Sequence, residues 1–368
     1  MNKDKIEQLI HEYYSTFDHV RFHKWNYEDG CILLAAIELY RATGNDLFRN
    51  FVIEYLSKHV EEDGTITHYS KEEYNLDHIA PGRALIFAYE ESGDERYRKA
   101  AETLMGQLSN HPRIEAGNYW HKKIYPNQVW LDGLFMAQPF YMAWETKYAK
   151  KEGYPDIASQ FRNVRRFMFD EEKKLYYHGY DESRSIFWAD KDTGLSANFW
   201  LRAIGWFLMS IIETMGEMSN QIYEYYDELQ QIYKEAIKGV LMYQNPEEKL
   251  FYQVVDRPDV EGNYLESSGS AMIAASILKA CRMKVLLDEK YWNIGEEILN
   301  SVIERKLVMK DGKVVLKDCC EVAGLGPYDN LRRDGSISYY LSEPVIENDN
   351  KALAALFMAY AQYLMGSK

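Results

Sequence analysis

Three features of the sequence predict an all-α fold in which six helical hairpins close into a barrel of two concentric rings. Helical periodicity runs through most of the chain, apolar helices alternate with charged amphipathic ones, and each apolar helix has a small residue near its start. A helix that is apolar on every side has to be buried, so the apolar helices should form the inner ring. The expected architecture is an (α/α)6 barrel with short strands in its rim loops.

The expected inner helices are rich in Ala, Gly and large apolar residues. They cover residues 28–43, 81–92, 130–148, 198–215, 266–283 and 349–366. Small residues near their starts let a backbone or a ligand approach closely, and these are Gly30, Gly82, Gly133, Gly205, Gly269 and Ala352. Pro81 suits the first position of its helix, and Pro139 is expected to kink the helix that contains it.

The expected outer helices are charged on one face. They cover residues 3–17, 45–60, 94–111, 154–169, 221–243 and 288–307, with Asn45 as a suitable cap. The first of them is the natural partner of the last inner helix, and that contact would close the ring. Strand-like segments at 175–181, 250–256 and 312–319 lie in loops. An open solenoid would repeat every ~34 to 47 residues, whereas the inner helices recur every roughly 50 to 80.

Composition limits which partners and which cellular compartment the protein can be expected to have. Lys plus Arg is 43 and Asp plus Glu is 57, a net charge of −14, which argues against nucleic acid. No apolar run is long enough for a bilayer, and the charged start MNKDKIEQLI is unlike a signal peptide. Four cysteines without metal-ligand spacing favour a reduced, cytoplasmic setting. Without a linker, residues 1–368 are expected to form one domain, a monomer or weak homo-oligomer.

Polar and aromatic side chains gather at the expected starts of the inner helices. If these helices run parallel, their N-termini meet at one mouth and create a partial positive potential that suits an anion. Carboxylates, histidines, cations and aromatic rings converge there, a mixture that suits a small anionic sugar. The candidate residues are Tyr27, Asp77, His121, Lys122, Trp130, Asp132, His178, Trp200 and Arg202.

Each of these residues also has a structural explanation. Asp132 and Asp77 could cap helices, and the two histidines could be hydrogen-bonded structural groups. Arg202 could be the buried partner of a carboxylate, and Trp200 could belong to the core. Convergence at one mouth is what favours a functional site.

Several motifs together resemble glycoside hydrolase family 105, the unsaturated rhamnogalacturonyl hydrolases. They are WHKKIYPNQVWLDGLFMAQPF (120–140), NLDHIAPGR (75–83), FWLRAIGW (199–206) and WNYEDG (25–30). The W-L-D-G-L element is the most specific. The sister family 88, which acts on unsaturated glycosaminoglycan disaccharides, typically carries an RGQAW-like fourth entrance, whereas this chain has RAIGW. Gln138 is larger than the residue expected before Pro139.

The resemblance implies an (α/α)6 barrel and a cytoplasmic enzyme that needs no metal or other cofactor. It places the catalytic aspartate at Asp132, with supporting positions at Asp77, His121, His178, Trp200 and Arg202. The expected substrate is a small anionic unsaturated oligosaccharide. As a hypothesis, Asp132 protonates C4 of the unsaturated uronate and then activates water, Arg202 binds the carboxylate, the histidines donate hydrogen bonds and Trp200 stacks on a ring.

Other functions stay open at this point. The chain could be an unsaturated glucuronyl hydrolase, or an ordinary inverting glycosidase that uses Asp77 and Asp132 as acid and base. Outside the enzymes, it could be a sugar-binding or scaffold protein whose acidic residues are caps. The sequence leaves undecided whether Glu266 and the loop 341–350 line the cavity.

Overall fold

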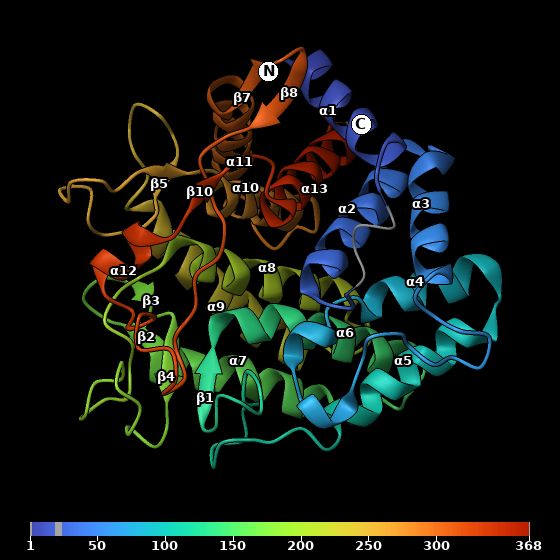
Figure 1. Ribbon diagram of the computed structural model, residues 1–368, viewed down its shortest axis with the longest axis horizontal. Helices are drawn as coiled ribbons and strands as arrows, with labels where there is room; N and C mark the ends of the chain where they lie inside the picture. Colours follow the sequence, from blue (N-terminus) through green and yellow to red (C-terminus); the bar gives the residue numbers. More distant parts are fainter. Residues whose placement is uncertain (1, 19–23, 368) are drawn as a thin grey trace.

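The computed structural model describes residues 2–18 and 24–367, and helices joined by long rim loops make up most of it (Figure 1). Within that part of the chain, six helices form an inner ring in which each contacts the next and the last contacts the first. They are α2 (Tyr27–Thr43), α4 (Gly82–Ser92), α6 (Leu131–Lys147), α8 (Leu201–Glu217), α10 (Ser267–Arg282) and α13 (Asn350–Gly366). The predicted all-α barrel is confirmed.

The amphipathic helices form the outer ring. They are α1 (Lys3–Ser15), α3 (Asp46–Ser57), α5 (Glu95–Leu108), α7 (Tyr154–Met168), α9 (Glu224–Leu241) and α11 (Glu289–Ser301), and from α3 onward each packs on the inner helix that precedes it. Helix α1 lies beside α13 (Figure 1), with the rings of Tyr13 and Tyr14 centred 5.7 and 5.8 Å from that of Phe357. The expected pairing of the first and last helices is therefore confirmed.

Small residues let the inner helices approach closely near their starts. A Cβ atom on Gly30 would lie 2.8 Å from the carbonyl carbon of Ala80, and one on Gly269 would lie 2.5 Å from Leu201. Because backbone cannot yield as a flexible side chain does, α2 and the segment before α4 fit together only without that Cβ. Although the inner helices are strongly apolar, none of the described helices combines the length and hydropathy needed to cross a membrane.

The strands are short antiparallel pairs in the rim loops. β1 (Gln128–Trp130) pairs with β4 (Gly179–Asp181), and β9 (Cys319–Cys320) pairs with β10 (Val345–Ile346). The remaining pairs are β2 (Phe169–Asp170) with β3 (Leu175–Tyr176), β5 (Phe251–Tyr252) with β6 (Leu265–Glu266), and β7 (Leu307–Lys310) with β8 (Lys313–Leu316). All three predicted strand-like segments contain strands, each shorter than expected.

The observed helix boundaries differ from the predicted ones by a few residues. Asn45 caps α3 as expected, accepting from the backbone N–H of Leu47 at 3.0 Å, but α3 ends at Ser57 rather than at residue 60. Pro81 is the cap of α4 rather than its first residue. The segment 288–307 gives α11 and then a π-helical turn, Val302–Lys306. Short helices at Lys71–Glu73, Leu76–His78 and α12 (Ile337–Ser342) were not predicted, because they are too short to show a helical period.

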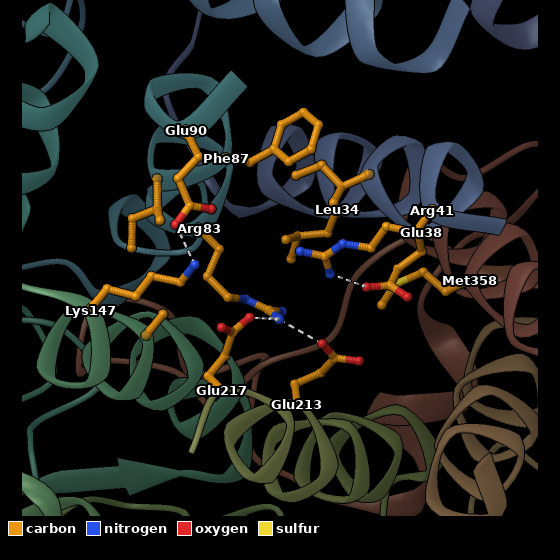
Figure 2. Close-up of a pocket in the computed structure, with 13 residues that line it drawn as sticks. Leu34, Glu38, Arg41, Arg83, Phe87, Glu90, Lys147, Glu213, Glu217 and Met358 are labelled. Atoms are coloured by element: carbon orange, nitrogen blue, oxygen red, sulfur yellow. Dashed lines mark hydrogen bonds and ion pairs between the residues drawn. The ribbon is translucent and has the colours of Figure 1, made fainter. Parts of the chain in front are cut away.

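A buried charge network joins the inner helices α2, α4, α8, α10 and α13, and Figure 2 shows the part of it in which Arg83 contacts Glu213. Glu213 of α8 lies 2.5 Å from Arg83 Nη1 of α4 and 2.8 Å from Lys279 Nζ of α10. Gln362 of α13 donates to Glu38 of α2 at 2.6 Å. Burial by itself raises the pKa of Glu213, but the two cations outweigh it and hold the pKa below its ordinary value. Glu213 is therefore an anion that these cations compensate.

Candidate active site

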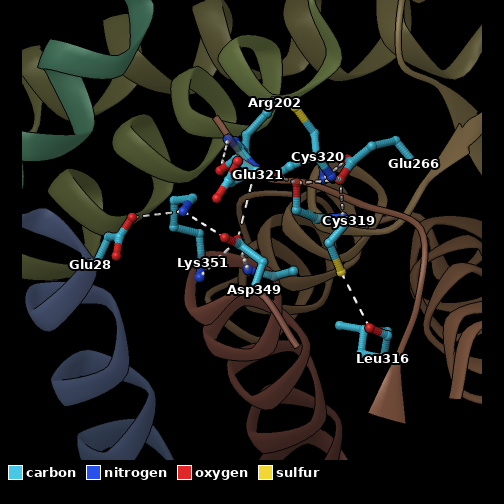
Figure 3. A network of polar contacts seen from close by, with 12 residues as sticks. Glu28, Arg202, Glu266, Leu316, Cys319, Cys320, Glu321, Asp349 and Lys351 are labelled. Carbon is cyan, nitrogen blue, oxygen red and sulfur yellow. Dashed lines mark hydrogen bonds and ion pairs between the residues drawn. The ribbon is translucent and has the colours of Figure 1, made fainter. Parts of the chain in front are cut away.

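The N-terminal ends of inner helices meet at one mouth, as the sequence predicts. Lys351, at the start of α13, donates to Glu28 at the start of α2 at 2.8 Å. Arg202, at the start of α8, lies 3.9 Å from Asp349, the cap of α13. Elements far apart in the sequence thus bring their first turns together (Figure 3).

Asp132 is the second residue of α6, and it is 8% exposed. The helix begins after Trp130 and has no side-chain cap, so the explanation of Asp132 as a helix cap is wrong. Its Oδ2 atom is buried and has no hydrogen-bond partner among the described residues. A buried carboxylate oxygen without a partner is costly, which points to a role that requires it to be free.

His178 lies opposite Asp132, in the residue just before β4. Its Nε2 atom lies 3.3 Å from Asp132 Oδ2, near enough for a hydrogen bond but not aligned for one. The pairing of Trp130 with Gly179 in the β1–β4 ribbon fixes the two segments, and the N–H of Leu131 donates to the carbonyl of His178 at 3.1 Å. Catalytic hydrogen bonds are often loose without substrate and tighten when it binds.

Asp77, His121 and Lys122 form a second polar cluster. Lys122 Nζ lies 2.5 Å from Asp77 Oδ2, and His121 Nε2 lies 3.8 Å from Asp77 Oδ1. Burial raises the pKa of Asp77, but Lys122 and His121 outweigh it, so the pKa falls below its ordinary value. Burial lowers the pKa of His121 to about 4. At neutral pH, Asp77 is therefore an anion bound to a cation, and His121 is neutral.

The Trp130 ring packs against the ring of His121. The two rings stack with centroids 4.4 Å apart and an interplanar angle of 17°, and the Tyr125 ring stacks on Trp130 at 4.6 Å and lies 6.1 Å from the His121 ring. Gly133 makes room for the imidazole, since a Cβ atom there would lie 3.1 Å from His121 Nδ1. The atypical Gln138 is buried near this imidazole, and its Oε1 has no partner among the described residues.

Trp200 and Tyr27 lie at the starts of α8 and α2, and Trp200 is almost fully buried, as its alternative assignment to the core predicts. Trp200 immediately precedes α8, is held by a bridge to Val254, and has its ring 4.8 Å from that of His178. Its indole N–H is buried and has no partner among the described residues. Tyr27, the first residue of α2, is partly exposed and has Lys351 Nζ 5.9 Å from its ring.

Arg202 is already engaged by the main chain (Figure 3). Its Nη1 donates to the carbonyl of Cys320, and its Nη2 donates to that of Glu321 at 3.1 Å. Only Nε is buried without a partner among the described residues. A bidentate clamp on a carboxylate, as the sequence led us to expect, would require these bonds to be exchanged. In this geometry Arg202 anchors the segment 319–321 to α8.

Two acidic residues whose role the sequence left open are structural. Glu266 is fully buried and caps α10, accepting from the N–H groups of Ser268 at 2.9 Å and Gly269 at 2.7 Å, and also from that of Cys320 at 3.0 Å. Asp349, in the loop 341–350, caps α13. Neither has the unpartnered oxygen that distinguishes Asp132.

Sequence reasoning missed Tyr340. It lies on α12, is fully buried, and its hydroxyl is 2.8 Å from His178 Nδ1. Its ring stacks on that of Trp200 at a centroid distance of 6.0 Å and an angle of 13°. A serine cap followed by two tyrosines in a six-residue helix carries no signal that could have singled it out.

A closed ring of helical hairpins with a free buried carboxylate and aromatic rings at its mouth defines a barrel-fold glycoside hydrolase. The sequence profile of Glycosyl Hydrolase Family 88 matches residues 2–366, and the chain belongs to this family. A family 105 glycoside hydrolase structure from C. acetobutylicum ATCC 824 is 35% identical, with a TM-score of 0.92 over 99% of each chain. The predicted family resemblance and the prediction of an enzyme are confirmed.

Two further comparisons concern proteins named for unsaturated substrates. The unsaturated rhamnogalacturonyl hydrolase YesR of Bacillus subtilis is 24% identical over 298 residues, which are 79% of this chain and 78% of YesR. The structure of an unsaturated glucuronyl hydrolase from Bacillus sp. GL1 is 15% identical, with a TM-score of 0.65 over 94% of this chain and 87% of that one. The second likeness shows a shared fold.

Proposed function

We propose that this glycoside hydrolase releases a 4,5-unsaturated uronic acid from the nonreducing end of rhamnogalacturonan fragments left by a lyase. The observation that carries the proposal is Asp132, a buried carboxylate that caps nothing and has one oxygen without a partner among the described residues. The similarity to YesR, which is named for this activity, supports the substrate class.

The chemistry would begin at the C4=C5 enol ether of the uronate. Protonated Asp132 gives its proton to C4, and positive charge develops at C5 and the ring oxygen. A water molecule bonds to C5 and loses a proton to the Asp132 carboxylate, which regenerates the acid. The hemiketal then opens to a ketone at C5, and C1 releases the neighbouring sugar as an alcohol. One water is consumed, and a single carboxyl group acts in both proton transfers.

The other residues would bind and orient the sugar. Asp77, held as an anion by Lys122, would accept hydrogen bonds from sugar hydroxyls, and neutral His121 would add a hydrogen bond. The partly exposed Tyr27 would present aromatic surface, and the buried Trp200 would support the ring of His178. Arg202 would contribute charge and its free Nε toward the uronate carboxylate, while Trp130 holds the His121 ring in place.

An inverting glycosidase that uses Asp77 with Asp132 is disfavoured. In such an enzyme one carboxyl group is a protonated acid and the other a base that activates water. The Lys122 ammonium 2.5 Å from Asp77 stabilises its anion and makes it a weak base, with a pKa below the ordinary value. Asp77 is better suited to hold a hydroxyl than to take a proton.

Ultraviolet absorbance tests the proposal directly. Unsaturated galacturonyl-rhamnose absorbs through its conjugated enol ether, so turnover should remove the band and release free rhamnose. No change with this substrate, but loss of the band with unsaturated glycosaminoglycan disaccharides, would move the activity to glucuronyl hydrolysis. Cleavage of saturated glycosides alone would contradict the hydration chemistry.

We also propose a cytoplasmic location, which free thiols in the described chain support. Cys31, Cys319 and Cys320 are buried, Cys281 is partly exposed, and none forms a disulfide within the described residues. Reduced thiols of this kind suit a reducing compartment. The expected monomer or weak homo-oligomer, and the single domain over 1–368, stay predictions.

A further inference from the structure

We infer that Tyr340 is a positioning residue that fixes which nitrogen of His178 carries the proton, and thereby places an N–H beside the carboxylate of Asp132. The inference rests on the proposed function for its catalytic meaning, but the proton arrangement itself can be judged without substrate. Three groups from different elements form the chain: Tyr340 on α12, His178 before β4, and Asp132 on α6.

The distances define a relay of contacts. The Tyr340 hydroxyl oxygen lies 2.8 Å from His178 Nδ1, and His178 Nε2 lies 3.3 Å from Asp132 Oδ2. Tyr340 and His178 are both fully buried. The rings of Trp200 and Trp130 lie 4.8 and 5.6 Å from that of His178, so aromatic walls confine the imidazole.

The Tyr340 hydroxyl determines the direction of the hydrogen bond between Tyr340 and His178. Burial raises the pKa of Tyr340 well above 10, so its hydroxyl keeps the proton. That O–H has no acceptor other than His178 Nδ1 among the described residues. A buried donor needs a partner, so Nδ1 is the acceptor and Nε2 carries the imidazole proton. The resulting Nε2–H faces Asp132 Oδ2, which otherwise has no partner.

The opposite arrangement leaves two groups unsatisfied. If Nδ1 carried the proton and donated to the phenol oxygen, the Tyr340 proton would have no acceptor within the described chain. When Asp132 is ionised, the Nε2 lone pair would then face the carboxylate, and like electron density would repel. Tyr340 therefore selects the tautomer that stabilises ionised Asp132, the form that accepts a proton from water.

Tyr340→Phe tests the inference in turnover. It removes the donor but keeps the ring that stacks on Trp200, so substrate binding should be preserved. We expect kcat to fall by about 10- to 100-fold, as for other residues that orient a catalytic group, with KM nearly unchanged. Tyr339→Phe is the matched control: its hydroxyl lies on the same helix but accepts from the N–H of Gly324 at 2.9 Å. Equal kcat in Tyr340→Phe and Tyr339→Phe would overturn the inference.

Nitrogen NMR of the imidazole tests the tautomer without substrate. In the wild-type protein, with the His178→Gln variant used for assignment, we expect the His178 Nδ1 signal to be that of an unprotonated acceptor and Nε2 to carry hydrogen. In Tyr340→Phe, the two His178 nitrogen signals should no longer show this single protonation pattern. A protonated Nδ1 in the wild-type protein would overturn the inference. Because this readout needs no turnover, it separates failure at Tyr340 from failure of the proposed substrate.

Discussion

Glu266, Asp349 and Asp132 are acidic residues at the starts of three of the inner helices, but only two of these three residues act as caps. Glu266 and Asp349 each precede their helix and accept from its first free N–H groups. Asp132 sits two residues later than a cap would, inside the first turn of α6. The sequence could place all three near a mouth, but their roles depend on where the helix begins, and sequence patterns locate that boundary only to within a few residues.

Asp132→Asn should abolish most turnover and spare the fold. The amide has the same shape but cannot donate or accept the catalytic proton, so kcat should fall by about 10²- to 10⁴-fold. The melting temperature should stay the same, since Oδ2 has no hydrogen-bond partner to lose within the described residues. Absorbance kinetics, a thermal melt and substrate binding measure the three effects. Substantial remaining activity would contradict the assignment of Asp132.

His111 should make the protein less stable in acid. Its Nε2 donates to the carbonyl of Trp120 at 2.8 Å, and burial lowers its pKa to about 4 from an ordinary 6.5. Between these values the unfolded chain binds more protons, so stability is present above pH 6.5 and lost as pH falls toward 4. The loss for this residue is up to about 3 kcal/mol. Urea unfolding of wild type and His111→Gln should show a smaller loss in the variant; parallel curves would contradict this.

At the scale of elements, long periodic helices were predictable and short ones were not. Every inner and outer helix of the ring was expected within a few residues of its observed bounds. Helix α12 was missed because six residues span less than two turns. That omission also hid Tyr340, so the part of the site contributed by a rim loop lay beyond sequence reasoning. Its position follows from tertiary packing against His178, not from local pattern.

Two glycines on helices should respond oppositely to alanine. Gly30→Ala should cost about 1–3 kcal/mol, because its Cβ would meet the backbone of Ala80 and Pro81 at 2.8 and 2.9 Å. Gly106→Ala is the matched control on α5, where the nearest atom to a new Cβ is Lys71 Nζ at 3.5 Å. Gly106→Ala should raise the free energy of unfolding by about 0.5–1 kcal/mol, because Ala has a higher helix propensity than Gly. Chemical denaturation of both variants measures the two changes in the free energy of unfolding. If Gly30→Ala left that free energy unchanged, α2 and the segment before α4 could move apart without cost.

At the scale of the molecule, charge pairs tie the ring together at both ends. Lys351 and Glu28 join α13 to α2 at the mouth, and Glu213 joins α4, α8 and α10 toward the other end. The sequence suggested buried charges only singly, as with Arg202. It could not predict the partners, since Arg83 and Glu213 are 130 positions apart and meet only once the ring has closed.

Glu213→Gln should destabilise the whole barrel. The change leaves Arg83 and Lys279 buried without their shared anion, and breaking such a pair costs about 3–5 kcal/mol. Glu90→Gln is the matched control, because Glu90 pairs with Lys147 at a position 42% exposed, where a surface pair contributes at most about 1 kcal/mol. Thermal and urea unfolding measure both. If the two variants lost the same stability, the network would not hold the ring together.

The contact between α1 and α13 makes neighbours of residues from opposite ends of the described chain. Lys3 Nζ lies 5.4 Å from the centre of the Tyr363 ring. The ring therefore closes on itself, so its geometry fixes the order of the hairpins around it but not the hairpin at which the chain begins. The turn at Gly44, between α2 and α3, has open space beside it. Cutting the backbone there and joining the former ends by a short linker would give a circular permutant with the same mouth.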